Sequence, residues 1–375
     1  MKVPVVVMRG GTSKGVFFNF DDMPSDRSLW DEFMLDIMGS PDSRQIDGLG
    51  GANSLTSKAA IIKKSGFEGI DVEYTFAQVS IENQLVDFKG NCGNISSAVG
   101  PYAIEQGLVP AIEPITTVRI FNTNTQKVII SEVEVEDGQV KTDGMCSIPG
   151  VPGTGSPIYL SFTNAEGAVT GKLFPTGNSI DVIQIPRGPI NVSIIDVANP
   201  LVFIHAHDVG LKGTELPHEF TPEKLTELEE IRSIAAEMCQ FATKEEATKK
   251  SPAVPKLTII APPMDYIDVT GVERKTENMD CIIRMMSMQK PHQALAITGA
   301  ICTTAGAFLN DTILSDTINV KQEVIRLAHP AGIMETKVDL IAGNITAIKV
   351  VRTARVILEG YAYTKKNYEY ISKLA

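Results

Sequence analysis

The chain has 375 residues, which is long for a single hydrophobic core, so its length predicts two domains. Its formal net charge of −11 argues against nucleic-acid and anionic-membrane partners, although a small anionic substrate can still bind at a locally positive site. The five cysteines form no CxxC pair, which argues against a disulfide framework and a structural zinc site.

Neither hydrophobic candidate for a targeting or membrane segment is convincing. The apolar run at the N-terminus stops at Arg9 and is too short for a signal peptide. Residues 293–309 form the nearest candidate for a membrane span, but this segment is short and contains three threonines, which favours a buried core helix. We therefore expect a cytoplasmic protein without a membrane partner, and a homo-oligomer is allowed.

Short β-rich runs dominate the chain. They carry β-branched residues or alternate apolar with polar residues, and Gly, Asn, Asp and Pro separate them. The runs that predict strands are residues 3–8, 15–20, 72–81, 116–124, 127–138, 190–197 and 201–209.

Three segments predict helices. Residues 221–238 are amphipathic, with Thr221 as N-cap and Pro222 in the first turn, which is typical of a surface helix. Residues 93–106 carry a charge only at Glu105, and residues 292–309 carry no fixed charge, so other structure must enclose both helices.

The two charge-poor helices lie about 200 positions apart, and each is surrounded by β-rich sequence. This pattern predicts one architecture used twice, a curved sheet wrapped around a central helix. We place the domains at 1–184, completed by about 355–375, and at 185–354.

The first candidate site motif is "MRGGTSKG", between two predicted strands. Its backbone N–H groups, hydroxyls and cations suit a small carboxylate or phosphate, although a hairpin turn with solvated basic ends explains the motif equally well. The candidate substrate-binding residues are Arg9, Gly10, Gly11, Thr12, Ser13 and Lys14.

The second motif is "GLGGANSLTSKAAII", where Lys58 stands at the border between a polar loop and an apolar segment. A partly buried lysine can have a lowered pKa and act as a base, whereas an ordinary lysine extends its ammonium into water. The loop adds Ser54, Thr56 and Ser57 as candidate substrate-binding residues.

The third motif is "GNCGN", which places Cys92 at the first turn of a charge-poor helix. The helix dipole and the free N–H groups there favour a thiolate and can hold a substrate carboxylate. A buried, inert cysteine is the alternative. Asn91, Gly93 and Asn94 supply amide donors and allow a close approach of the backbone.

The second charge-poor helix has a polar entry of its own. Ser287, Met288 and His292 lie just before or at its predicted start, the position that mirrors Cys92. No cysteine occupies that position. The five histidines show no HxxxH or comparable spacing, so we expect no metal site.

Long motifs give the chain a family resemblance. "MRGGTSKGVFF", "RQIDGLGGANSLTSKAAII", "YTFAQVSI", "GNCGNISSAVGPYAI", "DVANPLVFIHA" and "HPAG" resemble the PrpF family of 2-methylaconitate cis-trans isomerases and 3-methylitaconate Δ-isomerases. The resemblance covers nearly the whole chain. It implies an α+β fold of two diaminopimelate-epimerase-like domains, each a curved, mostly antiparallel sheet around a buried helix, with the active site in the cleft between them.

The resemblance also implies an activity. It is cofactor-independent proton transfer on a small unsaturated di- or tricarboxylate, with Lys58 and Cys92 as the catalytic pair. The second cysteine of true epimerases is missing here, which favours a lysine-centred mechanism. We expect conversion of 3-methylitaconate to 2,3-dimethylmaleate. The alternatives are 2-methylaconitate isomerisation, 4-oxalomesaconate tautomerisation and a non-enzymatic, anion-binding accessory role.

Overall fold

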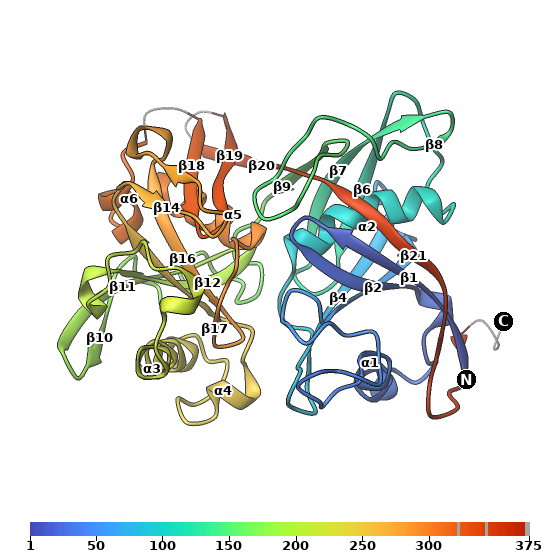
Figure 1. Ribbon diagram of the computed structural model, residues 1–375, viewed down its shortest axis with the longest axis horizontal. Coiled ribbons are helices and arrows are strands. Elements are labelled where there is room, and N and C mark those ends of the chain that lie inside the picture. The colour runs from blue at the N-terminus through green and yellow to red at the C-terminus, as the bar shows by residue number, and fades with distance from the viewer. Residues whose placement is uncertain (321–322, 342–343, 372–375) are drawn as a thin grey trace. The chain divides into compact units, whose positions relative to one another are not determined.

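The computed structural model describes residues 1–320, 323–341 and 344–371. The chain forms two compact units, one made of Met1–Leu160 with Val351–Ala375 and the other of Ser161–Val350 (Figure 1). The domain boundaries predicted from the sequence lie at 184/185 and 354/355, whereas the two units meet at 160/161 and 350/351. The first unit thus contains both ends of the chain, and strand β21 (Ala354–Tyr363) pairs antiparallel with β1 (Lys2–Gly10).

The first unit is a sheet around one helix. Its neighbouring strands are ordered β21–β1–β2–β3–β4–β6–β7–β9, and pairing is parallel at β2–β3 and β4–β6. Helix α2 (Gly93–Glu105) contacts β21, β1, β2, β3, β4, β6 and β7, and therefore lies inside the curve of the sheet. The remaining elements are β2 (Ser13–Asn19), η1 (Phe20–Asp22), η2 (Arg27–Leu29), α1 (Trp30–Met38), β3 (Lys58–Lys64), β4 (Val72–Val79), β5 (Val86–Asp87), β6 (Ile115–Asn122), β7 (Lys127–Glu136), β8 (Gln139–Val140) and β9 (Ile158–Thr163).

The second unit follows the same plan. Its strands are ordered β10–β11–β12–β13–β16–β18–β19–β20, with parallel pairing at β12–β13 and β16–β18. Helix α5 (Ile297–Phe308) packs on β11, β12 and β19. The remaining elements are β10 (Asp181–Ile185), β11 (Gly188–Val197), β12 (Asn199–His205), η3 (His207–Val209), η4 (Pro217–Glu219), α3 (Pro222–Met238), α4 (Ala247–Lys250), β13 (Lys256–Ala261), β14 (Tyr266–Ile267), β15 (Glu273–Arg274), η5 (Thr276–Asn278), β16 (Cys281–Ser287), β17 (Lys290–Pro291), α6 (Ile313–Thr317), β18 (Val324–His329), β19 (Gly332–Ile341) and β20 (Asn344–Arg352).

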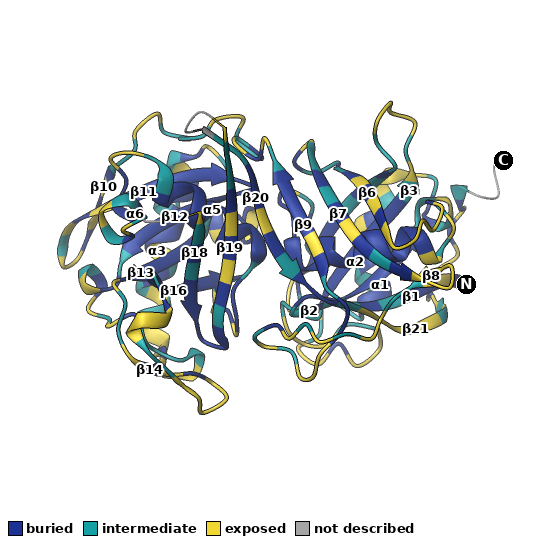
Figure 2. Ribbon diagram, turned by 90° about the horizontal axis from the view of Figure 1, so that it is seen from above, coloured by how far each residue is buried: buried dark blue, intermediate teal, exposed yellow. Residues whose placement is uncertain are grey.

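The duplicated architecture predicted from the two charge-poor helices is confirmed. The core strands, in order, are β1, β2, β3, β4, β6 and β7 in the first unit and β11, β12, β13, β16, β18 and β19 in the second. In each unit the pairing of successive core strands runs antiparallel, parallel, antiparallel, parallel, antiparallel. The central helix follows the fourth core strand and its short hairpin partner in both units. Figure 2 shows both central helices in the colour of buried residues, as enclosure within a sheet requires.

The predicted helices differ in how well their limits agree with the structure. Helix α3 begins as expected, because the Thr221 hydroxyl accepts a hydrogen bond from the N–H of Lys224. Helix α5 begins at Ile297 rather than at residue 292, because residues 287–291 form the β16–β17 hairpin instead. Helix α1, which packs its apolar face against the outer side of the first sheet, was missed.

No helix in the described part of the chain combines the length and the apolar character needed to cross a bilayer. The segment that raised the question, residues 293–309, contains the 12-residue helix α5, of which nearly every residue is buried. The prediction of a core helix there is confirmed.

Candidate active site

The β1–β2 hairpin turn is pressed against the start of α2. A Cβ atom added at Gly10 would lie 2.3 Å from the carbonyl oxygen of Asn94, and one added at Gly11 would lie 2.1 Å from Oδ1 of Asn94. Gly11 also has φ of 51°, a left-handed conformation that favours glycine. The glycines of the first motif therefore allow a backbone contact between the turn and the helix terminus.

Two hydroxyls of this turn are buried without partners. Oγ1 of Thr12 and Oγ of Ser13 have no hydrogen-bond partner among the described residues, while the N–H of Thr12 donates to Oδ1 of Asn94 at 3.3 Å. Buried hydroxyls normally find partners, so an unpaired set beside a helix N-terminus indicates room for a polar ligand.

The two cations of the first motif do not share the face of the hairpin on which Gly10 and Ser13 lie. Strand alternation places Arg9 and Lys14, which pair across the hairpin, on the face opposite Gly10 and Ser13. Nη1 of Arg9 donates to the carbonyl oxygens of Gly11 and Thr353 at 3.0 and 2.9 Å, so the guanidinium braces the turn. The structure thus gives Arg9 a contact with the turn backbone and does not place it or Lys14 beside the unpaired hydroxyls.

Lys58 is a buried lysine with an uncharged partner. It is the first residue of β3, it is 5% exposed, and its Nζ donates to Oε1 of Gln78. Burial lowers its pKa below the ordinary 10.5, and the nearby charge of Cys92 opposes this shift. The alternative of a lysine with its ammonium in water does not describe Lys58, and a lowered pKa suits a general base.

The loop before Lys58 is held by glutamine side chains. Oγ of Ser57 donates to Oε1 of Gln45 at 2.6 Å, and the N–H of Ala52 donates to the same oxygen at 2.8 Å. The hydroxyl of Thr56 donates to the carbonyl of Asn53 at 3.2 Å. The side chains of Ser57 and Thr56 are therefore engaged within the loop.

Ser54, the remaining candidate of this loop, contributes a backbone contact. Its carbonyl accepts a hydrogen bond from Nε2 of Gln78, so the loop is tied to the same amide that holds Lys58.

Cys92 is the N-cap residue of α2 and is 9% exposed. The first intrahelical bond runs from the N–H of Ser96 to the carbonyl of Cys92, so the N–H groups of Gly93, Asn94 and Ile95 have no acceptor within the helix. The Cys92 thiol does not cap the helix and lies at the positive end of its dipole. Helix α2 contacts β3, and the charge of Cys92 raises the pKa of Lys58, so the two predicted catalytic residues belong to elements packed on each other.

Asn91 supports this helix terminus, and the charge of Cys92 at the same terminus acts on Tyr74. Oδ1 of Asn91 accepts hydrogen bonds from Oγ of Ser96 at 3.2 Å and from Nδ2 of Asn122 at 3.4 Å. Complete burial, followed by the charge of Cys92, raises the pKa of Tyr74 well above its usual value, so this phenol stays protonated. The side-chain oxygen of Asn91 thus holds the start of α2, and the prediction that its amide N–H group donates to a substrate stays a prediction.

Sequence reasoning missed two buried polar residues near these groups. Gln78 lies in the motif "YTFAQVSI", but a single glutamine in an alternating strand is typical of a surface residue and does not indicate a site. Arg352 is 3% exposed, burial lowers its pKa to about 10, and a Cβ at Gly11 would lie 3.3 Å from its Cδ. No sequence signal joins Arg352 to Gly11, because they are far apart along the chain.

The other candidate residues belong to the second unit. Ser287 ends β16 and is 8% exposed, and Met288 has φ of 51° in the hairpin turn that follows. His292 is 5% exposed, and its Nδ1 accepts the N–H of Ala294 at 3.0 Å. The N-cap of α5 is Ala296, so these residues do not stand at a helix N-terminus as Cys92 does.

The described residues contain no disulfide among the cysteines and no cluster of potential metal ligands. All five cysteines are free thiols, and four of them are buried. Within residues 1–320, 323–341 and 344–371, no three His, Cys, Asp or Glu side chains are grouped as metal ligands would be.

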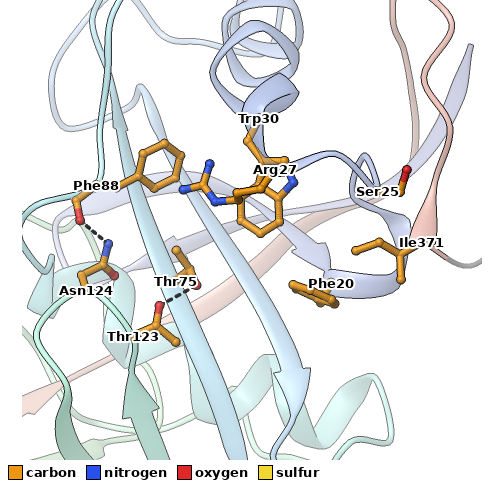
Figure 3. Close-up of a pocket in the computed structure, with 9 residues that line it drawn as sticks. All are labelled: Phe20, Ser25, Arg27, Trp30, Thr75, Phe88, Thr123, Asn124 and Ile371. Carbon is orange, nitrogen blue, oxygen red and sulfur yellow. Dashed lines mark hydrogen bonds between the residues drawn. The ribbon is translucent and has the colours of Figure 1, made fainter.

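A separate pocket of about 410 Å³ lies on the outer face of the first sheet (Figure 3). The guanidinium of Arg27 stands 4.1 Å from the ring of Trp30 and 4.3 Å from that of Phe88. Strand alternation puts the pocket residue Thr75 on the face of β4 opposite Gln78, so the pocket is distinct from the Lys58–Cys92 site.

Comparisons with known proteins identify the family of this chain. The family model described as PrpF protein matches residues 1–365. The chain is 60% identical to the YraM protein of Bacillus subtilis (strain 168), covering 98% of this chain and 99% of that one. It is 46% identical to a 3-methylitaconate isomerase of Eubacterium barkeri, covering 98% of both chains.

The solved structures agree on the fold. A crystal structure of methylitaconate-delta-isomerase matches with a TM-score of 0.78 and 46% identity, covering 97% of this chain and 96% of that one. A structure of a probable proline racemase from Agrobacterium radiobacter K84 matches with a TM-score of 0.54 and 12% identity over 97% and 93% of the two chains, which bears on the fold alone. The predicted epimerase-like α+β fold is confirmed. The chain belongs to the PrpF family, and it is an isomerase.

Proposed function

We propose that this isomerase converts 3-methylitaconate to 2,3-dimethylmaleate without a cofactor and that Lys58 is its base. One observation carries the proposal: Lys58 is a buried lysine with a lowered pKa, and its strand packs against the buried helix whose N-cap is Cys92. The 46% identity to a 3-methylitaconate isomerase over nearly the full length of both chains supports the choice of substrate.

The substrate carboxylates would bind where donors lack partners. The backbone N–H groups at the start of α2 and the buried hydroxyls of Thr12 and Ser13 lie on the same side of the first sheet as Lys58. The helix dipole and the buried cation of Arg352 make this region locally positive within an acidic protein. Neutralising a carboxylate there makes the carbon next to it more acidic.

The proton transfer then balances within the substrate. Neutral Nζ of Lys58 removes the proton from the saturated carbon that carries the methyl group, and the electrons of that C–H bond form a dienolate. The double bond moves between the two central carbons as a proton is delivered to the former methylene carbon, which becomes a methyl group. The donor is the ammonium of Lys58 or the thiol of Cys92, and no external oxidant or reductant is needed.

The test uses the purified protein and the ultraviolet change of the reaction. Lys58→Met should lower kcat by at least about 10²-fold, which is typical for loss of a general base. Lys63→Met is the matched control, because Lys63 lies on the same strand with a half-exposed side chain paired to Glu73 at 3.1 Å. Near-normal turnover by folded Lys58→Met protein would refute the assignment of the base.

Cys92→Ser separates two roles for the thiol. A loss of kcat comparable to that of Lys58→Met assigns proton donation to Cys92, whereas a nearly unchanged kcat assigns it to the Lys58 ammonium. Parallel assays with trans-2-methylaconitate and 4-oxalomesaconate test the substrate. Faster turnover of either one than of 3-methylitaconate would overturn the proposed substrate and leave the base assignment intact.

The proposal includes the surroundings of the enzyme. A net charge of −11 supports a small carboxylate rather than nucleic acid as partner, and the sequence supports a cytoplasmic location. A homo-oligomer remains allowed.

A further inference from the structure

Among the described residues, only the side chain of Gln78 links Lys58 to the preceding loop through hydrogen bonds. It lies directly opposite Lys58 in the β3–β4 register and is 5% exposed. Its Nε2 donates to the carbonyls of Ser54 at 3.2 Å and Ser57 at 3.1 Å, while its Oε1 accepts from Nζ of Lys58.

These contacts fix the orientation of the amide. Both hydrogens of Nε2 have backbone acceptors, so the amide oxygen must face the lysine. A flipped amide would put an N–H group against the ammonium and an oxygen against two carbonyls. The loop is itself held through Ser57 and Gln45, so the position of Oε1 is set by the backbone on two sides.

The partner of Lys58 is neutral, and this has a chemical consequence. A neutral amine that donates one hydrogen to Oε1 has its rotation about the Cε–Nζ bond restrained, which directs its lone pair away from Gln78. A carboxylate at this position would hold Nζ equally well but would favour the ammonium, which cannot take a proton. An amide therefore positions the base while leaving it free to act.

The charged and titratable groups that face Lys58 and Gln78 come from three elements. The start of α2 contributes Cys92, and β4 contributes Tyr74, whose phenol stays protonated. Strand β5 contributes the buried carboxylate of Asp87, which pairs with Gln78 on the side away from Lys58, and the β2 neighbour Gly15 has no side chain. No ion pair of Lys58 with an Asp or Glu is found in the described residues. Cys92 is thus the group that opposes the effect of burial on Lys58.

We propose that Gln78 is a positioning residue, which orients the Lys58 amine for proton transfer through a partner that carries no charge of its own. This inference rests on the proposed role of Lys58 as base. It adds a residue that never touches the substrate in the mechanism above and acts only through the lysine.

The first test is Gln78→Glu, which preserves the size of the side chain and introduces a charge. An opposite charge at hydrogen-bond distance should raise the pKa of Lys58 by about one unit or more. Each unit removes about 10-fold of the neutral amine at neutral pH. We expect kcat/KM at pH 7 to fall by at least that factor and to recover at higher pH. Gln184→Glu, on an exposed position of β10, controls for the same change in net charge.

The second test is Gln78→Met, which removes the acceptor without adding charge. We expect kcat to fall about 10-fold or more with little change in KM, because the amine loses its orientation while the groups assigned to substrate binding stay in place. If the carboxylate of Gln78→Glu repels the carbonyls of Ser54 and Ser57 and disturbs the loop, Gln78→Met still tests the role of the amide oxygen. Thermal unfolding and circular dichroism check that each variant is folded.

A readout independent of turnover separates this inference from the proposed function. In protein labelled with ¹³C at lysine Cε, the Lys58 signal, assigned by its loss in Lys58→Arg, reports the titration of the amine. A higher midpoint in Gln78→Glu than in wild type supports the inference even if 3-methylitaconate is not the substrate. An unchanged midpoint in Gln78→Glu, or a wild-type kcat in Gln78→Met, would overturn it. An inactive wild-type protein would instead refute the proposed function.

Discussion

The contact between the hairpin turn and α2 predicts a large effect for a very small substitution, Gly10→Ala. The added Cβ would lie 2.3 Å from the carbonyl oxygen of Asn94, whereas ordinary van der Waals contact begins near 3.4 Å. The turn and the helix terminus must therefore separate by about 1 Å. The obstructing atom belongs to the backbone of a buried helix, so it cannot rotate away as a side chain would.

Two measurable consequences follow from that separation. Overpacking of this kind costs about 1–3 kcal/mol of folding free energy, which urea or thermal unfolding detects. A displacement of about 1 Å between groups that bind the substrate can cost about 10²-fold in rate. We therefore expect kcat/KM for 3-methylitaconate to fall by more than the loss of folded protein explains.

Gly66→Ala is the matched control for this substitution. Nothing lies within 4 Å of a Cβ added at Gly66, in the turn between β3 and β4. Its stability should stay within about 0.5 kcal/mol of wild type, and its activity should not change. If Gly10→Ala behaved like Gly66→Ala in both assays, the close approach of the turn to α2 would be wrong.

Two further predictions concern pH and helix capping. Because Lys58 must be neutral to accept a proton and burial lowers its pKa, kcat/KM should rise with pH through a midpoint below 10.5, and a midpoint at or above that value would contradict the proposed base. Thr221→Ala should lower the free energy of unfolding by about 1 kcal/mol, since it removes the hydroxyl that caps α3, and should leave kcat unchanged; an unchanged stability in urea unfolding would show that the cap contributes nothing.

Local patterns in the sequence determine which elements are buried. The absence of charge in residues 93–104 is enough to predict an enclosed helix, since a helix without charged residues on any side is not suited to face water. The duplicated plan follows from finding such a helix twice. The Thr221 cap is equally local, because a hydroxyl and an N–H three residues away settle it. The site motifs, with Lys58 and Cys92, stand out by their residue types, and the family resemblance implies that these two residues form a catalytic pair.

Local patterns fail where one segment has two allowed structures. Residues 287–296 can form either a hairpin or an extension of α5. Because residues 292–296 carry no fixed charge, the sequence pattern alone extends the helix back to residue 292. The hairpin wins because Met288 and Gln289 adopt positive φ angles and let Lys290 pair with Ser287 on β16. Helix α1 is short, and its burial depends on a sheet face formed by distant strands.

The sequence by itself thus determined the fold class, the buried helices and the two residues of the proposed proton transfer. Only the tertiary structure decided that Gln78 stands opposite Lys58 and that Arg352 lies under Gly11. The physical reason is that periodicity encodes the face of a strand that is buried, whereas the register between strands depends on contacts between residues far apart in the chain. The surroundings that make Lys58 a suitable base are set by that register.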